Sequence, residues 1–245
     1  MRARLVVGIV LLLAVGCLPG PAAAQSARMI LALGNIGFLN PQSVQAATGA
    51  EVKTGLDNFL LKDFSMAVLA NIAFTTLPGP VQQGLVQYVT GGGTLLITGG
   101  SESFGSGGYQ AAASLIPFDI RSASDWRFTP FRSPVPIQPG HPILAGVTFI
   151  TVGNLNDMNP RADATEILQA AGGGSAAGGP LAGGGFRGGG SYPYPLIAEV
   201  SVGSGRVIGI AFDLNEFAGM KDRDLFVRNT IEYLLRASRI GPPTR

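Results

Sequence analysis

Two apolar runs on either side of a helical stripe constrain the fold of this chain most. Residues 65–72 (SMAVLANI) and 94–98 (TLLIT) are short runs without polar alternation, which is typical of strands covered on both faces. Between them Pro78 and Pro80 open a helix, and apolar residues then recur at helical spacing up to Gly91. A strand, helix, strand order of this kind predicts a right-handed crossover and a parallel sheet.

The rest of the pattern adds elements of the same kind. Residues 28–36 form a further apolar run, and the runs 196–202 and 206–212 are joined by Gly-Ser-Gly as in a hairpin. Residues 222–236 predict a closing helix. Weaker signals predict a short helix and a weak strand within 41–62, a short helix at 109–115, short strands at 149–152 and 165–168, and an irregular surface excursion over 119–140. We therefore expect one three-layer α/β domain over residues 25–236.

Two segments are too rich in glycine and proline to join a core. Residues 172–190 contain eleven glycines, so we expect a flexible Gly-rich loop inserted into the domain. The hairpin and helix that follow it are too short to form a core of their own, which favours a single domain. Residues 237–245 contain a Gly-Pro-Pro sequence and are expected to form a flexible tail.

The first 24 residues predict export. Arg2 and Arg4 precede an apolar run over 5–15, and three alanines at 22–24 offer a cleavage site. The run is shorter than the ~20 residues that a membrane span needs. Alternatively, cleavage before Cys17, in a context similar to a weak lipoprotein box, would leave a lipid-anchored protein. We expect a periplasmic or extracellular protein that is either soluble or lipid-anchored at Cys17.

Composition excludes several classes of function. The chain has 17 basic and 15 acidic residues, so loss of Arg2 and Arg4 with the signal peptide leaves 15 of each. The charges are mixed and no basic stripe appears, so we expect no nucleic-acid partner. Cys17 is the only cysteine, which excludes a disulfide, a thiolate nucleophile and a cysteine metal site from the mature domain. We predict neither a cofactor nor a metal.

Three segments together resemble the class I glutamine amidotransferase-like superfamily. They are residues 77–100 (LPGPVQQGLVQYVTGGGTLLITGG), 141–147 (HPILAGV) and 194–217 (YPLIAEVSVGSGRVIGIAFDLNEF). More narrowly, the chain is similar to non-catalytic amidotransferase-like domains of bacterial envelope proteins, and more loosely to ThuA-like proteins. The resemblance covers residues 28–236 without the Gly-rich loop. It implies a flavodoxin-like, mostly parallel sheet with helices on both faces.

The residues that catalyse glutamine hydrolysis in that superfamily are not matched. In its catalytic members a G-x-C-x-G turn follows the strand, and a His-x-Glu pair completes the triad. Here Gly99 matches the first glycine, but Ser101 stands at the cysteine and Ser103 at the last glycine. The single histidine, His141, is followed by Pro-Ile and precedes the last strands. The resemblance therefore implies a domain without this activity, since the mechanism uses a thiolate activated by an imidazole.

Two candidate sites lie near the ends of the expected strands. Ser101 and His141 would form a serine hydrolase dyad if the fold brought them together, whereas the alternative is a polar turn whose serines cap the next helix. Glu102, Asp213 and Glu216 follow strands whose carboxyl ends would meet at one edge. There they would bind a hard cation or serve as acid and base in sugar chemistry, or they are solvated turn residues. The candidate ligand-binding residues are Gly100, Ser101, Glu102, Ser103, Asp213, Asn215 and Glu216.

An aromatic and basic patch marks the excursion over 119–140. Its members are Trp126, Arg127, Phe128, Phe131 and Arg132. The patch would bind a glycan or a partner protein, or its aromatic rings tuck under their own loop. Neither the glycines at 91–93 nor those around 203–205 match a phosphate-binding loop. We expect an exported, non-catalytic module that binds an envelope protein, a small molecule or a glycan; the alternative is a hydrolase or carbohydrate-active enzyme.

Overall fold

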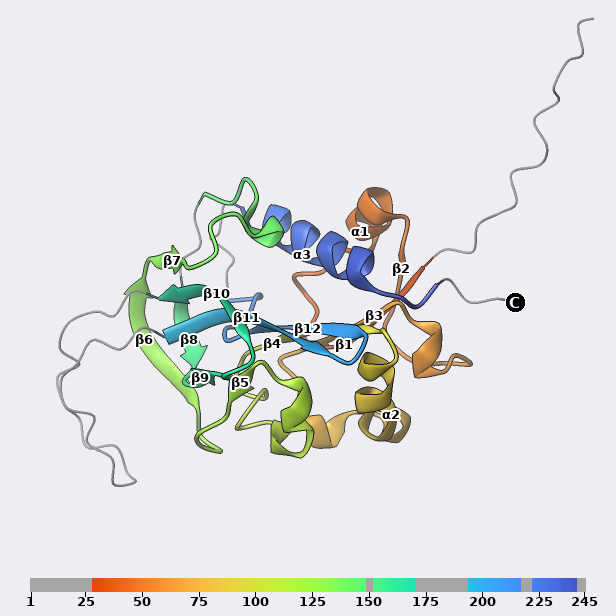
Figure 1. Cartoon of the computed structure of the whole chain (residues 1–245), viewed down its shortest axis with the longest axis horizontal. Helices are drawn as coiled ribbons and strands as arrows, with labels where there is room; N and C mark the ends of the chain where they lie inside the picture. Colours follow the sequence, from red (N-terminus) through yellow and green to blue (C-terminus); the bar gives the residue numbers. More distant parts are fainter. Residues whose placement is uncertain (1–27, 149–151, 171–193, 217–221, 242–245) are drawn as a thin grey trace, which may run out of the picture.

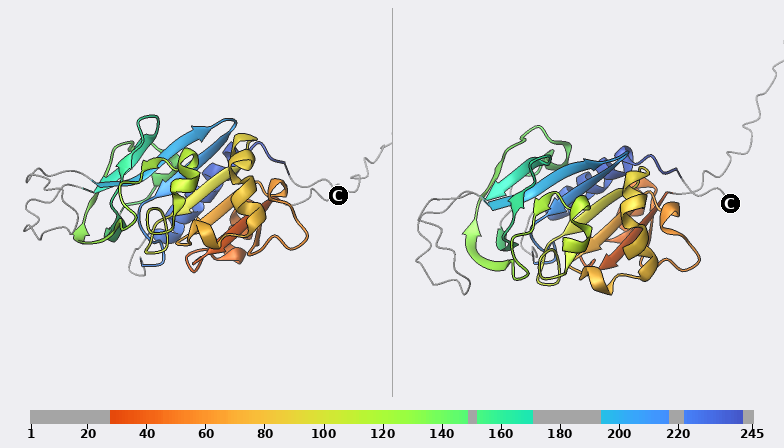
Figure 2. Two further views of the ribbon diagram at one scale, coloured as in Figure 1. Left: turned by 90° about the horizontal axis from the view of Figure 1, so that it is seen from below. Right: turned by 60° about the horizontal axis from the view of Figure 1, so that its bottom comes forward.

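An eight-stranded sheet between two layers of helices organises the molecule (Figures 1 and 2). The computed structural model describes residues 28–148, 152–170, 194–216 and 222–241. The α-helices are α1 (Pro41–Thr48), α2 (Gly79–Thr90) and α3 (Arg223–Ala237), and the 3-10 helices include η3 (Tyr109–Leu115) and η4 (Pro142–Leu144). The strands are β1 (Met29–Gly34), β2 (Glu51–Lys53), β3 (Met66–Ala70), β4 (Thr94–Thr98), β5 (Phe118–Asp119), β6 (Trp126–Arg132), β7 (Pro134–Pro136), β8 (Val152–Asn156), β9 (Asn159–Pro160), β10 (Thr165–Ala170), β11 (Tyr194–Val202) and β12 (Gly205–Ile210).

The sheet is parallel on one side and antiparallel on the other. Its order is β2-β1-β3-β4-β12-β11-β10-β7. The first five strands run parallel, and the remaining three pairings are antiparallel. The expected crossover is confirmed, because α2 connects β3 to its parallel neighbour β4. The expected hairpin is also confirmed, and β12 then continues parallel to β4, which brings the ends of these two strands to the same edge.

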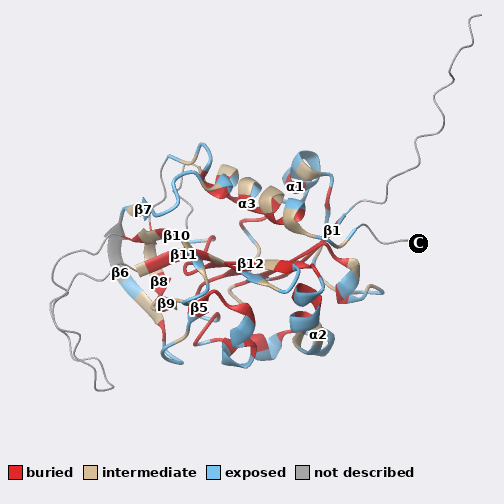
Figure 3. Ribbon diagram, in the orientation of Figure 1, coloured by how far each residue is buried: buried red, intermediate tan, exposed pale blue. Residues whose placement is uncertain are grey.

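The hydrophobic core is divided by the sheet into two clusters (Figure 3). One cluster lies under α1 and α3, where Val44 and Ile231 meet strand residues such as Ile30. The other lies under α2 and η3, where Leu85 and Tyr109 face the opposite side of the same strands. All five residues of β3 and of β4 are buried, as the unalternated apolar runs predict for strands covered on both faces. The three-layer α/β architecture is therefore confirmed.

The prediction of an irregular excursion over 119–140 is wrong, because this segment forms strands. Strand β6 pairs with β8, and β7 pairs with β10 as the last strand of the main sheet. Prolines at 134 and 136 hide this strand in the sequence, since proline is normally excluded from a sheet except at its edge. The Ile137 amide donates to the Ile167 carbonyl at 2.9 Å. Backbone alternation therefore directs the nitrogens of both prolines toward the open edge.

The glycines at 91–93 and 203–205 form a packed junction at the amino-terminal edge of the sheet. The Ser204 amide donates to the Thr90 carbonyl at 2.9 Å, which joins the β11–β12 turn to the end of α2. A Cβ atom on Gly93 would lie 2.4 Å from ring carbons of Tyr88. The Tyr88 hydroxyl donates to the Thr94 carbonyl, and burial raises the pKa of this phenol well above its usual range. These glycines are therefore explained by close packing.

The chain after α3 is attached to the same junction, in contrast to the loose tail that we expected from residue 237. The Arg239 amide donates to the Gly92 carbonyl at 2.9 Å, and the Ser65 hydroxyl donates to the Ile240 carbonyl at 3.0 Å. Ile240 also packs against the core cluster under α2. Residues 242–245, the Gly-rich loop over 172–190 and the expected signal peptide with Cys17 lie outside the described residues. Within the described ranges, no helix is long and apolar enough to span a membrane.

Candidate functional site

Polar side chains meet at the carboxyl edge, which we define as the turns that follow β1, β3, β4 and β12. Asn71, directly after β3, is the centre of this edge and has a positive φ of 40°. Its amide nitrogen Nδ2 donates to Asp213 Oδ2 at 2.9 Å, and its Oδ1 accepts from the Glu102 backbone amide at 2.9 Å. One asparagine thereby connects the turn after β4 to the turn after β12. The expectation that these turns lie together is confirmed.

Two glycines after β4 allow the asparagine side chains to approach. A Cβ atom on Gly100, whose φ is 144°, would lie 2.1 Å from Asn71 Cγ. Asn156 of β8 closes the turn from the other side, because its Oδ1 accepts from the Gly100 amide at 2.9 Å and its Nδ2 donates to the Gly100 carbonyl at 3.2 Å. A Cβ atom on Gly99 would lie 2.4 Å from Asn156 Oδ1. Gly99 and Gly100 therefore leave room for the side-chain amides of Asn71 and Asn156, which hold this turn.

The turn at Ser101 does not have the geometry of a nucleophile elbow. In such an elbow the serine occupies a strained turn between a strand and a helix. Among the described residues, positive φ angles outside glycine occur only at Asp57, Asn71 and Phe104, so Ser101 is not strained in this way. Ser101 is exposed, and turns rather than an α-helix follow it until η3 begins at Tyr109.

The expected capping role of the serines is also wrong. Ser103 is fully buried, and its hydroxyl donates back to the Thr98 carbonyl at 2.8 Å. The next helical segment, η3, begins after Gly108 without a capping side chain. Ser103 therefore stabilises the turn itself and is unavailable to a ligand.

His141 lies away from the Ser101 turn. Its ring packs edge-on against Tyr233 of α3 with 4.9 Å between ring centroids, and its Nε2 lies 3.6 Å from Glu199 Oε2 of β11. The contacts of the Ser101 turn are instead with Asn71 and Asn156. The structure therefore does not bring the hypothetical dyad of Ser101 and His141 together.

The three candidate carboxylates have different environments. Asp213 is 4% exposed and accepts from Asn71 and from both the backbone and side-chain nitrogens of Asn215, so it is not the solvated turn residue of the alternative interpretation. Glu216 is exposed and accepts from Asn154 Nδ2 at 2.9 Å, and Glu102 is exposed. No group of three metal-ligating side chains occurs within the described part of the chain.

Replacing Asn71 with aspartate is expected to destabilise the protein by about 2–3 kcal/mol at pH 7, because two carboxylates would face each other where an amide now donates. Aspartate tolerates the same positive φ, so the backbone preference is retained. Lowering the pH should reduce this destabilisation. A proton on one of the two carboxylates removes their repulsion, so the folded variant would bind that proton more tightly than the unfolded chain does. Urea unfolding at pH 7 and pH 5 measures both effects.

Asn154→Asp is the matched control for this change. Asn154 donates to Glu216 across 2.9 Å in the same way, but this pair is exposed and solvent screens the repulsion. We expect this variant to lose less than about 1 kcal/mol. Equal losses of unfolding free energy in Asn71→Asp and Asn154→Asp would contradict the central role given to Asn71 at the carboxyl edge.

The aromatic and basic patch is only partly exposed. Phe128 is 77% exposed, whereas Trp126 and Arg127 are partly buried on β6. Phe128 therefore does not tuck under its own segment. The side chains of Phe131 and Arg132 lie outside the described part of the structure.

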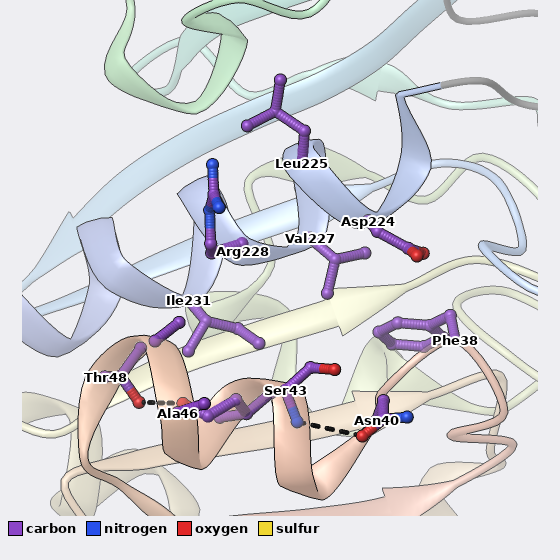
Figure 4. Close-up of a pocket in the computed structure, with 12 residues that line it drawn as sticks. Phe38, Asn40, Ser43, Ala46, Thr48, Asp224, Leu225, Val227, Arg228 and Ile231 are labelled. Atoms are coloured by element: carbon purple, nitrogen blue, oxygen red, sulfur yellow. Dashed lines mark hydrogen bonds between the residues drawn. The ribbon is translucent and has the colours of Figure 1, made fainter.

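A groove of about 500 Å³ lies between α1 and α3 (Figure 4). Phe38, Val44, Val227 and Ile231 supply apolar lining, and Asp224 and Arg228 are among its polar members. None of the residues selected from the sequence lines this groove. No motif in the sequence indicates it, because it arises from the packing of two distant helices.

Sequence reasoning missed the amides of the carboxyl edge. Asn35 and Asn71 lie near the ends of the apolar runs 28–36 and 65–72, so a search for any polar residue at strand ends, rather than for carboxylates and serines, would have found them. Asn156 and Asn154 belong to β8, whose position depends on tertiary structure. Asp125, which is 1% exposed and accepts from the Gly105 and Ser106 amides, carries no local signal either.

Solved structures share this fold at low sequence identity. A cytoplasmic protein from Salmonella typhimurium LT2 aligns with a TM-score of 0.61 and 14% identity, over 84% of this chain and 99% of that chain. A protein described as ThuA-like, from Bacteroides uniformis, aligns with a TM-score of 0.58 and 12% identity, over 92% and 98%. β-Galactosidase from Bacillus circulans sp. alkalophilus aligns with a TM-score of 0.50 and 12% identity, over 89% of this chain but 32% of that chain.

These likenesses show the fold alone. No protein-family model matches the sequence, and no curated protein matches it significantly. The chain has a mixed α/β fold that it shares with proteins described as ThuA-like. The mixed α/β architecture with a mostly parallel sheet and helices, which the sequence resemblance implied, is therefore confirmed, and the sheet has an antiparallel side.

Proposed function

We propose that this chain is a non-catalytic, amidotransferase-like domain that binds a ligand or a partner protein at its carboxyl edge. The observation that carries the proposal is the environment of Ser101. This serine stands at the position of the family's nucleophile, but it is unstrained, and the single histidine of the chain contacts Glu199 and Tyr233 instead. A serine nucleophile needs a base within hydrogen-bond reach.

The hydrogen bonding of the edge supports binding rather than chemistry. Asn71, Asp213 and Asn156 use their polar atoms to hold the turns. Ser101, Glu102 and Glu216 remain exposed on the surface that these turns form. Because the turns are already held in place, binding a partner here requires ordering of the exposed side chains but not of the backbone.

A carbohydrate-active enzyme using Glu102, Asp213 and Glu216 is the second candidate. It is favoured by Asn71, which connects the Asp213 carboxylate to the backbone of Glu102. Against it, both oxygens of Asp213 already accept hydrogen bonds within the protein. A glycosidase would need two carboxyl groups free to act on the sugar.

We place the protein in a bacterial envelope on the basis of residues 1–24 alone. Two structural neighbours from Salmonella typhimurium are named cytoplasmic proteins, so export is a property that we infer for this chain and not for the fold. Mass spectrometry of the exported protein is expected to find a new terminus at Gln25, whereas a lipidated Cys17 would indicate the anchored form. An unprocessed chain in the cytoplasm would contradict export.

Ser101→Ala is expected to leave any hydrolytic rate within about twofold of wild type, because the single histidine of the chain contacts Glu199 and Tyr233 instead of this serine. The full chain should be screened with esters, amides and glycosides, and Ser124→Ala, an exposed serine elsewhere, is the control. Activity that disappears only in Ser101→Ala would overturn the non-catalytic assignment.

Binding at the edge is tested separately. The double variant Glu102→Lys and Glu216→Lys reverses the charge of two exposed groups there, and Glu51→Lys makes the same change at the opposite edge of the sheet. We expect retention of envelope proteins or glycans on immobilised protein to fall in the double variant and to persist in the control. Equal retention by both variants would place binding elsewhere.

A further inference from the structure

The single histidine of the chain lies in a closed polar cluster on the α3 face of the sheet. The His141 side chain is 10% exposed. The titratable and charged groups that face it, among the described residues, are Glu199 of β11, Arg206 of β12 and Tyr233 of α3. None of these residues belongs to the carboxyl edge.

The hydrogen bonds of His141 determine which ring nitrogen carries the proton. Nδ1 accepts from the Ile143 amide at 3.4 Å, so His141 caps the short helix η4. An accepting nitrogen has no proton, and in a neutral imidazole the proton then resides on the other nitrogen. Nε2 is buried, has no hydrogen-bond partner among the described residues, and faces Glu199 Oε2 across 3.6 Å, just beyond hydrogen-bond distance.

Glu199 already accepts from two donors and has room for a third at Oε2. The Tyr233 hydroxyl donates to its Oε2 at 2.9 Å, and Arg206 lies 3.5 Å from its Oε1. Arg206 also contacts the Tyr233 hydroxyl directly. Arg206 and His141 therefore approach different oxygens of the Glu199 carboxylate. A protonated His141 ring would face this carboxylate rather than the Arg206 guanidinium.

We propose that His141 is a pH-sensitive latch on the segment that η4 begins. The neutral ring caps η4 through Nδ1. Protonation places a hydrogen on Nδ1, which then opposes the Ile143 amide hydrogen, and the charged ring moves toward Glu199 to make a charge-assisted hydrogen bond through Nε2. Acid thus exchanges one partner of His141 for another and releases the Ile143 amide at the start of η4.

The rest of the segment is held independently, so the release is local. Asn229 of α3 donates to the Ala145 carbonyl at 2.8 Å, and Thr148 donates to Asp222 through both its amide and its hydroxyl. These contacts are made by an asparagine, a threonine and an aspartate and involve no imidazole. The opening is therefore expected at the Ile143 amide and not at Thr148.

Nuclear magnetic resonance of the full chain tests the latch, because a single histidine gives a single imidazole signal. At pH 8 the ring nitrogen shifts should show a proton on Nε2 and none on Nδ1. Between pH 8 and pH 5, the exchange protection of the Ile143 amide, corrected for the intrinsic rate, should fall about three- to tenfold, the weight of one hydrogen bond. The Thr148 amide should not change.

His141→Asn is the matched variant, since asparagine caps a helix equally at both pH values and does not titrate. Its Ile143 protection should be the same at pH 5 and pH 8; His141→Gln replaces it if the asparagine variant does not fold. A proton on Nδ1 at pH 8 would overturn the proposal. So would protection of Ile143 that is unchanged by pH in wild type or falls equally in the variant.

Discussion

Replacing Gly99 with alanine is expected to destabilise the protein by about 3 kcal/mol or more. The new Cβ atom would lie 2.4 Å from Asn156 Oδ1, 2.6 Å from the Ala211 carbonyl carbon and 2.7 Å from the Phe212 nitrogen. Two of these atoms belong to the backbone that continues β12. They cannot swing aside as the end of a flexible side chain could, so the strands themselves must separate.

Urea unfolding of Gly99→Ala measures this loss, with Gly79→Ala as the control. Gly79 begins α2, and a Cβ atom there meets nothing within 4 Å. Alanine at that position is expected to be neutral or stabilising by up to about 1 kcal/mol. Wild-type stability in Gly99→Ala would show that the turn after β4 opens without cost and is not a preformed surface.

Asp125→Ala is expected to cost about 3 kcal/mol. The carboxylate is 1% exposed and accepts from the Gly105 amide at 3.0 Å and from both the amide and the hydroxyl of Ser106 at 3.2 Å. These bonds hold the chain just beyond Ser101. Alanine would leave the buried Gly105 amide without an acceptor, and hydrogen bonds to a charged group contribute more than neutral ones.

Two further variants separate this loss from a general effect of removing charge. Asp224→Ala removes an exposed carboxylate whose neighbour is Arg223, and we expect a change below about 1 kcal/mol. Asp125→Asn keeps one oxygen and should fall between wild type and Asp125→Ala. Equal unfolding midpoints for Asp125→Ala and Asp224→Ala would contradict the role given to the buried carboxylate.

The half of the fold that follows local patterns could be predicted from the sequence. The runs at 65–72 and 94–98 became β3 and β4, because strands buried on both faces need apolar residues at every position. Strand β7 could not be predicted, since its identity depends on β10, a distant segment that pairs with it only in the folded chain. Its prolines argue against a strand in any position but an edge.

The place of the candidate site could be predicted, but its hydrogen bonding could not. Parallel strands bring their carboxyl ends to one edge, so Ser101, Glu102 and Asp213 were expected together. Asn71 and Asn156 determine which of these residues face solvent, because their side-chain amides form hydrogen bonds with Asp213 and with the Gly100 backbone. No spacing in the sequence indicates that Ser101 would be exposed and Asp213 buried.

The outer strands of the sheet affect whether many copies of the protein can aggregate by strand pairing. Pro134 and Pro136 direct nitrogens without hydrogens toward the open side of β7, so an incoming strand would find no donor at either position. The opposite outer strand, β2, has only three residues and carries the ion pair of Glu51 with Lys53. Neither rim is a template for cross-β polymerisation, which protects an apolar sheet of this size from fibril growth during concentration or storage.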